Sequence, residues 1–206
     1  MNVIGFDDGP FPRDHRGDVL LVGVVCSGTR VDGVVSGRIR RDGANATRAM
    51  IDLVRKSQFG EHLQAVMLQG IAVGGFNVVD VHALSTALRI PVLILTRRPP
   101  DMAAVRRALF SDAPNARPRV AGARRKWSLI EKAGAMELLT PSRRAARRAT
   151  GVTQTPKLWI QRAGLSLEAA RRVVHDTTLH GNIPEPLRLA HLIAGGITTG
   201  SSRGRA

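Results

Sequence analysis

Two adjacent acids stand at the end of an apolar segment near the N-terminus. Asn2 to Phe6 is a short apolar run that Asp7-Asp8-Gly9-Pro10 follows directly, which predicts a strand that ends in a turn. A carboxylate at the end of a strand is held rigidly and exposed by the turn, and this suits metal binding. Because side chains alternate between the faces of a strand, we expect only one of Asp7 and Asp8 to point into a site. The alternative is a turn in which both acids bond to nearby backbone.

A third acid and a glycine-rich stretch follow further along the chain. Asp42 precedes an expected helix, where it can serve a site or simply cap the helix. Residues 68–80 read Leu-Gln-Gly-Ile-Ala-Val-Gly-Gly-Phe-Asn-Val-Val-Asp, a strand that runs into a glycine-rich loop and then a helix. That arrangement offers free backbone N–H groups to an anion. It lacks the lysine of a P-loop and the spacing of a dinucleotide fingerprint.

The last expected helix carries two polar side chains in a chemically useful relation. Arg188 and His191 are three residues apart and therefore share a helical face. Pro186 stands in the first turn of this helix, where proline is tolerated. The alternative is a surface helix in which His191 has no chemical role.

The elements that must position these residues can be read from the apolar pattern. The first three strands are expected over 2–6, 18–27 and 34–39, joined by tight turns as an antiparallel meander. Helices over 46–56, 77–88 and 102–110 then alternate with strands over 65–68 and 90–95, with Asn77 capping the second helix, and this order predicts parallel βαβ units. A strand over 157–161 and helices over 165–175 and 185–193 complete a mixed sheet flanked by helices. We expect an α/β fold of one domain over residues 1–200, followed by a disordered basic tail over 201–206.

The charge of the chain favours a polyanionic partner. The formal net charge is +15, and residues 101–206 hold 19 basic and 7 acidic side chains, against 12 and 9 in residues 1–100. From Arg117 to Arg148 there are ten Lys and Arg, among them Arg143-Arg144 and Arg147-Arg148 at helical spacing. An excess of arginine attracts nucleic acid by releasing its counterions. This basic segment is read either as a solvated face or as a surface that contacts phosphates.

Several classes of protein are disfavoured by the composition. Cys26 is the single cysteine, so neither an internal disulfide nor a cysteine-based metal site can form. The longest apolar run, Val19 to Cys26, is far shorter than the roughly 20 residues that span a bilayer. The N-terminus also lacks the pattern of a signal peptide. We therefore expect a cytoplasmic protein with no membrane contact.

Three of these segments together resemble a known family. Asp7-Asp8-Gly9-Pro10-Phe11, the stretch from Gly75 to Asp80 and the stretch from Pro184 to His191 resemble the DUF 99 family, over about residues 3 to 202. That family is similar to endonuclease V, which has a ribonuclease H-like fold and cuts a strand near a deaminated base, inosine above all, using Mg²⁺ held by acidic side chains.

The resemblance implies a set of site residues. Gly5-Phe6-Asp7 matches the strand of endonuclease V whose acid binds the metal, Asp42 falls near its second acid, and Gln69 stands where its third acid would be. Asp7, Asp42 and His191 would be catalytic, and Asp7, Asp42 and Gln69 would hold Mg²⁺ or Mn²⁺. An amide at position 69 removes one negative charge from that site, and Asp8 or Asp80 could compensate for it.

Two hypotheses follow from the charge and the resemblance. The first is a metal-dependent endonuclease acting on a DNA or RNA backbone, and the second is a nucleic-acid-binding protein of the same fold that has lost cleavage. A third hypothesis is a protein that binds a small phosphate or a nucleotide through the glycine-rich loop. The expected nucleic-acid contacts are Gly70, Gly74, Gly75, Asn77, Arg188, Arg124, Arg125 and Lys126.

Overall fold

A seven-stranded mixed sheet forms the centre of the protein, in the order β3-β2-β1-β4-β7-β9-β8. The computed structural model describes residues 1–110, 119–139, 157–179 and 181–203. The strands of this sheet are β1 (Asn2–Asp8), β2 (Asp18–Ser27), β3 (Arg30–Arg40), β4 (Ala65–Gln69), β7 (Val92–Thr96), β8 (Glu137–Leu139) and β9 (Leu158–Ala163). β1, β2 and β3 form the expected antiparallel meander, β1, β4 and β7 run parallel, and β9 is antiparallel to both β7 and β8.

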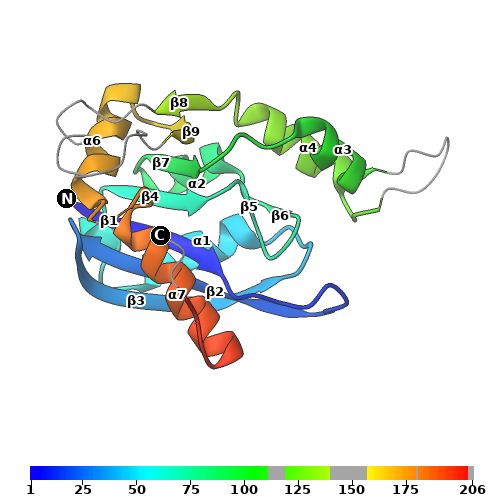
Figure 1. Cartoon of the computed structure of the whole chain (residues 1–206), viewed down its shortest axis with the longest axis horizontal. Helices are drawn as coiled ribbons and strands as arrows, with labels where there is room; N and C mark the ends of the chain where they lie inside the picture. The colour runs from blue at the N-terminus through cyan, green and yellow to red at the C-terminus, as the bar shows by residue number, and fades with distance from the viewer. Residues whose placement is uncertain (111–118, 140–156, 180, 204–206) are drawn as a thin grey trace.

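Helices cover both faces of the sheet (Figure 1). They are α1 (Ala46–Lys56), α2 (Val81–Leu88), α3 (Met102–Leu109), α4 (Ala123–Lys132), α6 (Leu167–Thr177) and α7 (Glu185–Thr199), with a short 3-10 turn, η1 (Gly60–His62). Ile4 and Phe6 of β1 pack in one core with α1 and α2, whereas Val3 packs in a second core with α6 and α7. The period-2 alternation of β1 therefore sends successive side chains to different helix layers, as expected for a fold of this class.

A small two-stranded hairpin and two helices extend from the end of the sheet where β1, β4 and β7 finish. β5 (Ala72–Val73) and β6 (Asn77–Val78) pair as this hairpin, and Gly74 and Gly75 between them adopt positive φ. A third, smaller apolar cluster joins Val78 of β6 to Leu109 of α3 and to Ala123 of α4. Figure 1 shows α3 and α4 side by side beyond the hairpin, at the end opposite α6.

The predicted start of the second helix is wrong. The helix begins at Val81 and not at Asn77, and the Asp80 carboxylate caps it by accepting from Ala83 N at 3.0 Å. Asn77 instead lies fully buried in β6, and its Oδ1 accepts from Ala46 N, the first residue of α1, at 3.0 Å. The two glycines between β5 and β6 turn the chain back on itself, so Asn77 meets a helix that is distant in sequence.

One other expectation about a helix end also changes. Asp42 does not cap α1, because Asn45 occupies the N-cap position. Of the predicted tail over 201–206 the structure describes residues 201–203, where the Ser202 hydroxyl donates to the Leu192 carbonyl at 2.5 Å. The arginine pairs at 143–144 and 147–148 lie outside the described residues. None of the helices that the structure describes is both long enough and apolar enough to cross a membrane.

Candidate active site

The structure brings Asp7 and His191 together at the end of β1. His191 Nδ1 lies 2.8 Å from Asp7 Oδ2, although 184 positions separate the two residues. The Asp7 side chain is only 13% exposed, whereas the His191 side chain is 51% exposed. When Nδ1 of a neutral imidazole donates to a carboxylate, Nε2 becomes the acceptor nitrogen. The pair therefore combines a sheltered carboxylate with an accessible ring that can take a proton.

Gly5 of β1 determines how closely α7 approaches the strand. A Cβ at Gly5 would lie 2.6 Å from the Pro186 carbonyl carbon and 2.7 Å from Leu187 N, so only glycine leaves room for the helix backbone. From Gly5 to Asp7 a strand advances about 6.6 Å, and from Leu187 to His191 a helix advances about 6 Å. The contact at Gly5 therefore places His191 beside Asp7.

Gln69 lies beside Asp7 on the neighbouring strand. The parallel ladder of β1 and β4 pairs Phe6 with Leu68, so Asp7 and Gln69 are opposite each other one residue further along. Met67 packs in the core under α6 and α7, and alternation directs exposed Gln69 to that same face. The amide of Gln69 thus shares with Asp7 and His191 the carboxyl end of the parallel strands, where open α/β sheets bind ligands.

The two adjacent acids face opposite sides of the sheet, as alternation predicted. Asp8 follows Ile4 and Phe6 in the alternation of β1, on the face that packs with α1, and the backbone N–H of Gly74 lowers its pKa against the larger effect of burial. Burial and the nearby charge of Asp7 raise the pKa of Asp8 to about 6, and burial raises the pKa of Asp7 against the opposing effect of His191. Burial thus disfavours the ionised form of both carboxyl groups. A cation close to Asp7 would favour that form again.

Asp42 does not join the Asp7–His191 pair through its carboxylate. Its Oδ1 accepts from Phe76 N at 2.7 Å, and its Oδ2 lies 3.3 Å from Arg41 Nε. In the part of the chain that the structure describes, no three Asp, Glu, His or Cys side chains are grouped closely enough to hold a metal ion. The structure thus joins Asp7 to His191, places Gln69 at the end of the adjacent strand and gives Asp42 a separate set of partners.

Several N–H groups of the glycine-rich loop have acceptors within the protein. Gly70 N donates to Leu95 O at 3.2 Å, and Phe76 N donates to Asp42 Oδ1 at 2.7 Å. A Cβ at Gly75 would lie 2.5 Å from Asp42 Oδ1, so the carboxylate fills the space against the loop. The Asp42 carboxylate thus takes one donor of this loop and the space beside Gly75, and Asn77 is fully buried.

The four basic side chains that were expected to contact nucleic acid have different environments. Arg188 donates to both carboxylate oxygens of Glu185, at 2.6 to 3.0 Å, and this buried partner raises the pKa of Arg188. Arg124 and Arg125 are exposed on α4. Lys126 is only 4% exposed and donates to the Asp42 carbonyl oxygen. Lys126 is therefore wrong as a surface contact, because its ammonium is directed into the protein.

Relatives of this chain cover nearly all of its length. A family model described as Endonuclease dU matches residues 1–198. A UPF0215 protein of Deinococcus radiodurans is 48% identical over 204 residues, which are 99% of this chain and 92% of that protein. A UPF0215 protein of Methanothermobacter thermautotrophicus is 39% identical over 210 residues, with coverage of 100% and 92%.

Solved structures confirm the expected fold and the resemblance to endonuclease V. A protein from Archaeoglobus fulgidus superimposes with a TM-score of 0.75 at 31% identity, covering 95% of this chain and 97% of that one. Endonuclease V of Bacillus subtilis gives 0.56 at 12% identity, covering 97% and 81%. Endonuclease V of Ciona intestinalis, in complex with DNA containing an inosine, gives 0.52 at 15% identity, covering 92% and 82%. The fold is ribonuclease H-like.

Proposed function

Because the chain belongs to the Endonuclease dU family, we propose that it is a metal-dependent endonuclease that cuts a nucleic-acid strand at or near a deaminated base. The observation that carries this proposal is the Asp7–His191 pair, 2.8 Å apart at the end of β1. The family description favours deoxyuridine as the base. The inosine in the DNA bound by Ciona endonuclease V makes inosine the second base to test.

The residues at this place fit a divalent cation that shares its coordination with the substrate. Asp7 offers a sheltered carboxylate whose ionised form a cation would favour, and Gln69 offers an amide oxygen on the adjacent strand. Mg²⁺ is commonly held by one or two carboxylates together with water and phosphate oxygens. When bound, such an ion activates water and stabilises the leaving oxygen. Asp42, with its carboxylate on Phe76 N–H, is assigned to positioning in this proposal.

His191 has the proton-handling role. Its Nδ1 is engaged by Asp7, which fixes the ring and leaves Nε2 to accept a proton from water or return one to the leaving group. His191→Asn keeps an N–H where Nδ1 stands but removes Nε2. We expect the cleavage rate to fall by roughly 100-fold with little change in affinity. Single-turnover cleavage and a binding titration on the same substrate check this, and an unchanged cleavage rate would remove His191 from the mechanism.

The exposed face of α4 is the proposed contact for the nucleic-acid backbone. Arg124 and Arg125 lie next to each other on this face. On the buried face of α4, Lys126 donates to the carbonyl oxygen of Asp42, which lies in the turn between β3 and α1, called here the Asp42 turn. Each phosphate contact contributes about 0.9 to the slope of log K against log salt concentration for duplex DNA. We expect the double variant Arg124→Gln/Arg125→Gln to lower that slope by up to about 2 and to weaken binding alike for every sequence.

A matched control removes the same charge elsewhere. Arg171 and Arg172 are exposed on α6, at the opposite end of the molecule from α4 (Figure 1). Arg171→Gln/Arg172→Gln should leave the salt slope nearly unchanged. Equal slopes for the two double variants, measured by fluorescence anisotropy between low and moderate salt, would contradict a contact on α4.

The cleavage assay separates the two hypotheses. Purified protein is incubated with labelled DNA and RNA strands that contain deoxyuridine, inosine or neither, in Mg²⁺, Mn²⁺ or EDTA. The proposal predicts a product that requires the metal and one of the modified bases. Salt-sensitive binding without any product would support the second function, a binding protein that has lost cleavage, which the neutral Gln69 favours.

A further inference from the structure

The buried face of α4 contains one charged residue among apolar ones. Ala123, Lys126 and Ile130 form that face, and all three are buried. An ammonium group taken out of water loses its hydration, and a well-packed apolar side chain would stabilise such a position more. Burial lowers the pKa of Lys126, partly offset by the charge of Asp42. The stability of α4 therefore does not explain why a lysine stands at this position, and the contact that Lys126 makes points to another role.

That contact joins α4 to the turn between β3 and α1. Lys126 Nζ donates to the carbonyl oxygen of Asp42. Asp42 is a non-glycine residue at φ 51°, a left-handed conformation that L-residues rarely adopt. Such a conformation persists only where surrounding contacts hold it. The lysine is one of these contacts, because it fixes the direction of the carbonyl.

The Asp42 turn also forms hydrogen bonds with the loop between β5 and β6. Asp42 N donates to Gly74 O at 2.8 Å, and Phe76 N donates to Asp42 Oδ1 at 2.7 Å. The backbone N–H of Gly74 also favours the ionised form of Asp8, the residue next to Asp7, and so opposes the rise in the pKa of Asp8. A series of contacts thus connects α4, through two turns, to the end of β1.

We propose that Lys126 is a positioning residue that holds α4, with Arg124 and Arg125 on its outer face, in a fixed place relative to the Asp7–His191 pair. A nucleic-acid backbone bound on α4 then presents its scissile bond at the end of β1. This inference rests on the proposed function for its consequence, but the link itself can be tested without cleavage. A displacement of about 1 Å at a reacting centre can cost roughly 100-fold in rate, so a loose α4 should impair cleavage more than binding.

The test compares Lys126→Met with Lys132→Met. Both substitutions remove one charge from α4, but the Lys132 side chain is 54% exposed and lies 3.5 Å from Asp80. We expect Lys126→Met to lower the single-turnover cleavage rate at saturating protein by about 100-fold, and Lys132→Met to lower it less than about threefold. The dissociation constants of the two variants, each lacking one cation, should stay similar.

Hydrogen exchange keeps the link testable if the wild-type chain does not cleave. The Phe76 amide, bonded to Asp42, should exchange about tenfold faster in Lys126→Met than in Lys132→Met, because its acceptor turn is loosened. The Ile160 amide in β9 should exchange equally in both and reports global unfolding. Lys126→Arg keeps donors in that position and should restore slow exchange at Phe76 if Lys126→Met proves poorly folded. Equal Phe76 exchange in the Met variants, or loss of cleavage and affinity by the same factor, would overturn the inference.

Discussion

Asp7→Asn is expected to abolish cleavage while leaving nucleic-acid binding nearly intact. The substitution keeps the shape of the side chain but removes the negative charge that a cation at the end of β1 requires. Since a bound cation supplies several kcal/mol of transition-state stabilisation, the rate should fall by at least about 1000-fold. The arginines of α4 are untouched, so the dissociation constant should change by less than about threefold. Single-turnover cleavage and anisotropy titrations with one labelled strand measure both quantities.

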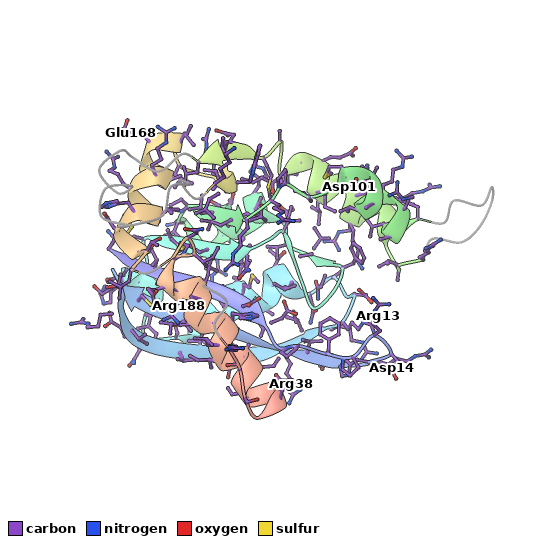
Figure 2. The ribbon with its side chains drawn as sticks, in the orientation of Figure 1. Arg13, Asp14, Arg38, Asp101, Glu168 and Arg188 are labelled. Atoms are coloured by element: carbon purple, nitrogen blue, oxygen red, sulfur yellow. The ribbon has the colours of Figure 1, made fainter. Side chains whose placement is uncertain are left out.

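A second aspartate gives the matched control. Asp14 lies in the exposed loop between β1 and β2, on the part of this loop that points away from α7 (Figure 2). Asp14→Asn makes the same chemical change, so it should cleave at close to the native rate. Cleavage by Asp7→Asn at a native rate in metal-replete buffer would end the nuclease proposal, because Asp7 supplies the carboxylate that bonds to His191.

Local patterns in the sequence predicted six of the seven strands of the sheet and the opposite orientation of the two acids, but they did not predict β8 (Glu137–Leu139). Apolar runs marked the strands, and period-2 alternation placed Asp7 and Asp8 on opposite faces, where His191 and Gly74 meet them. The register of β1 and β4 then put Gln69 next to Asp7. The strands and the opposite faces of Asp7 and Asp8 depend only on the regular geometry of single strands, which is why sequence alone predicts them. Gln69 was assigned to the site from the resemblance to endonuclease V.

The errors concern polar side chains whose partners are distant in sequence. Asparagine is a common helix cap, and Asn77 precedes a helix, but its side-chain oxygen accepts from the first N–H of α1. Lys126 stands in a run of cations, yet its spacing from Ala123 and Ile130 places it on the buried face of α4, a signal that was present in the sequence. Asp42 binds a loop whose position no local pattern reveals. Such polar contacts are fixed by tertiary packing and not by propensity.

The contact between Gly5 and α7 gives the prediction with the largest effect on stability. Gly5→Ala would place a methyl group 2.6 Å from the Pro186 carbonyl carbon and 2.7 Å from Leu187 N. These are backbone atoms, which cannot turn aside as a flexible side chain can, so α7 must move away from β1. Overpacking of this kind costs about 3 kcal/mol or more, which lowers the melting temperature by roughly 6–12 °C in a chain of this size.

The same displacement should separate His191 from Asp7. At a temperature where Gly5→Ala remains folded, we expect a further loss of about 100-fold in cleavage, since roughly 1 Å of misplacement is enough for that effect. Gly196→Ala is the control within the same helix: among the described residues, a Cβ there would meet Ser202 Oγ alone, at 3.7 Å. Alanine is favoured over glycine in a helix by up to about 1 kcal/mol, so this variant should melt slightly higher than the native protein.

The two alanine variants together distinguish a general effect on α7 from the specific contact at Gly5. If α7 only needed to be helical, Gly196→Ala would stabilise the protein and Gly5→Ala would leave its melting temperature nearly unchanged. If instead β1 must approach the helix backbone this closely, Gly5→Ala alone should lose both stability and the His191–Asp7 contact. The imidazole resonances of His191 report that contact, and native His191 shifts in a destabilised Gly5→Ala protein would mean that another element holds the histidine in place.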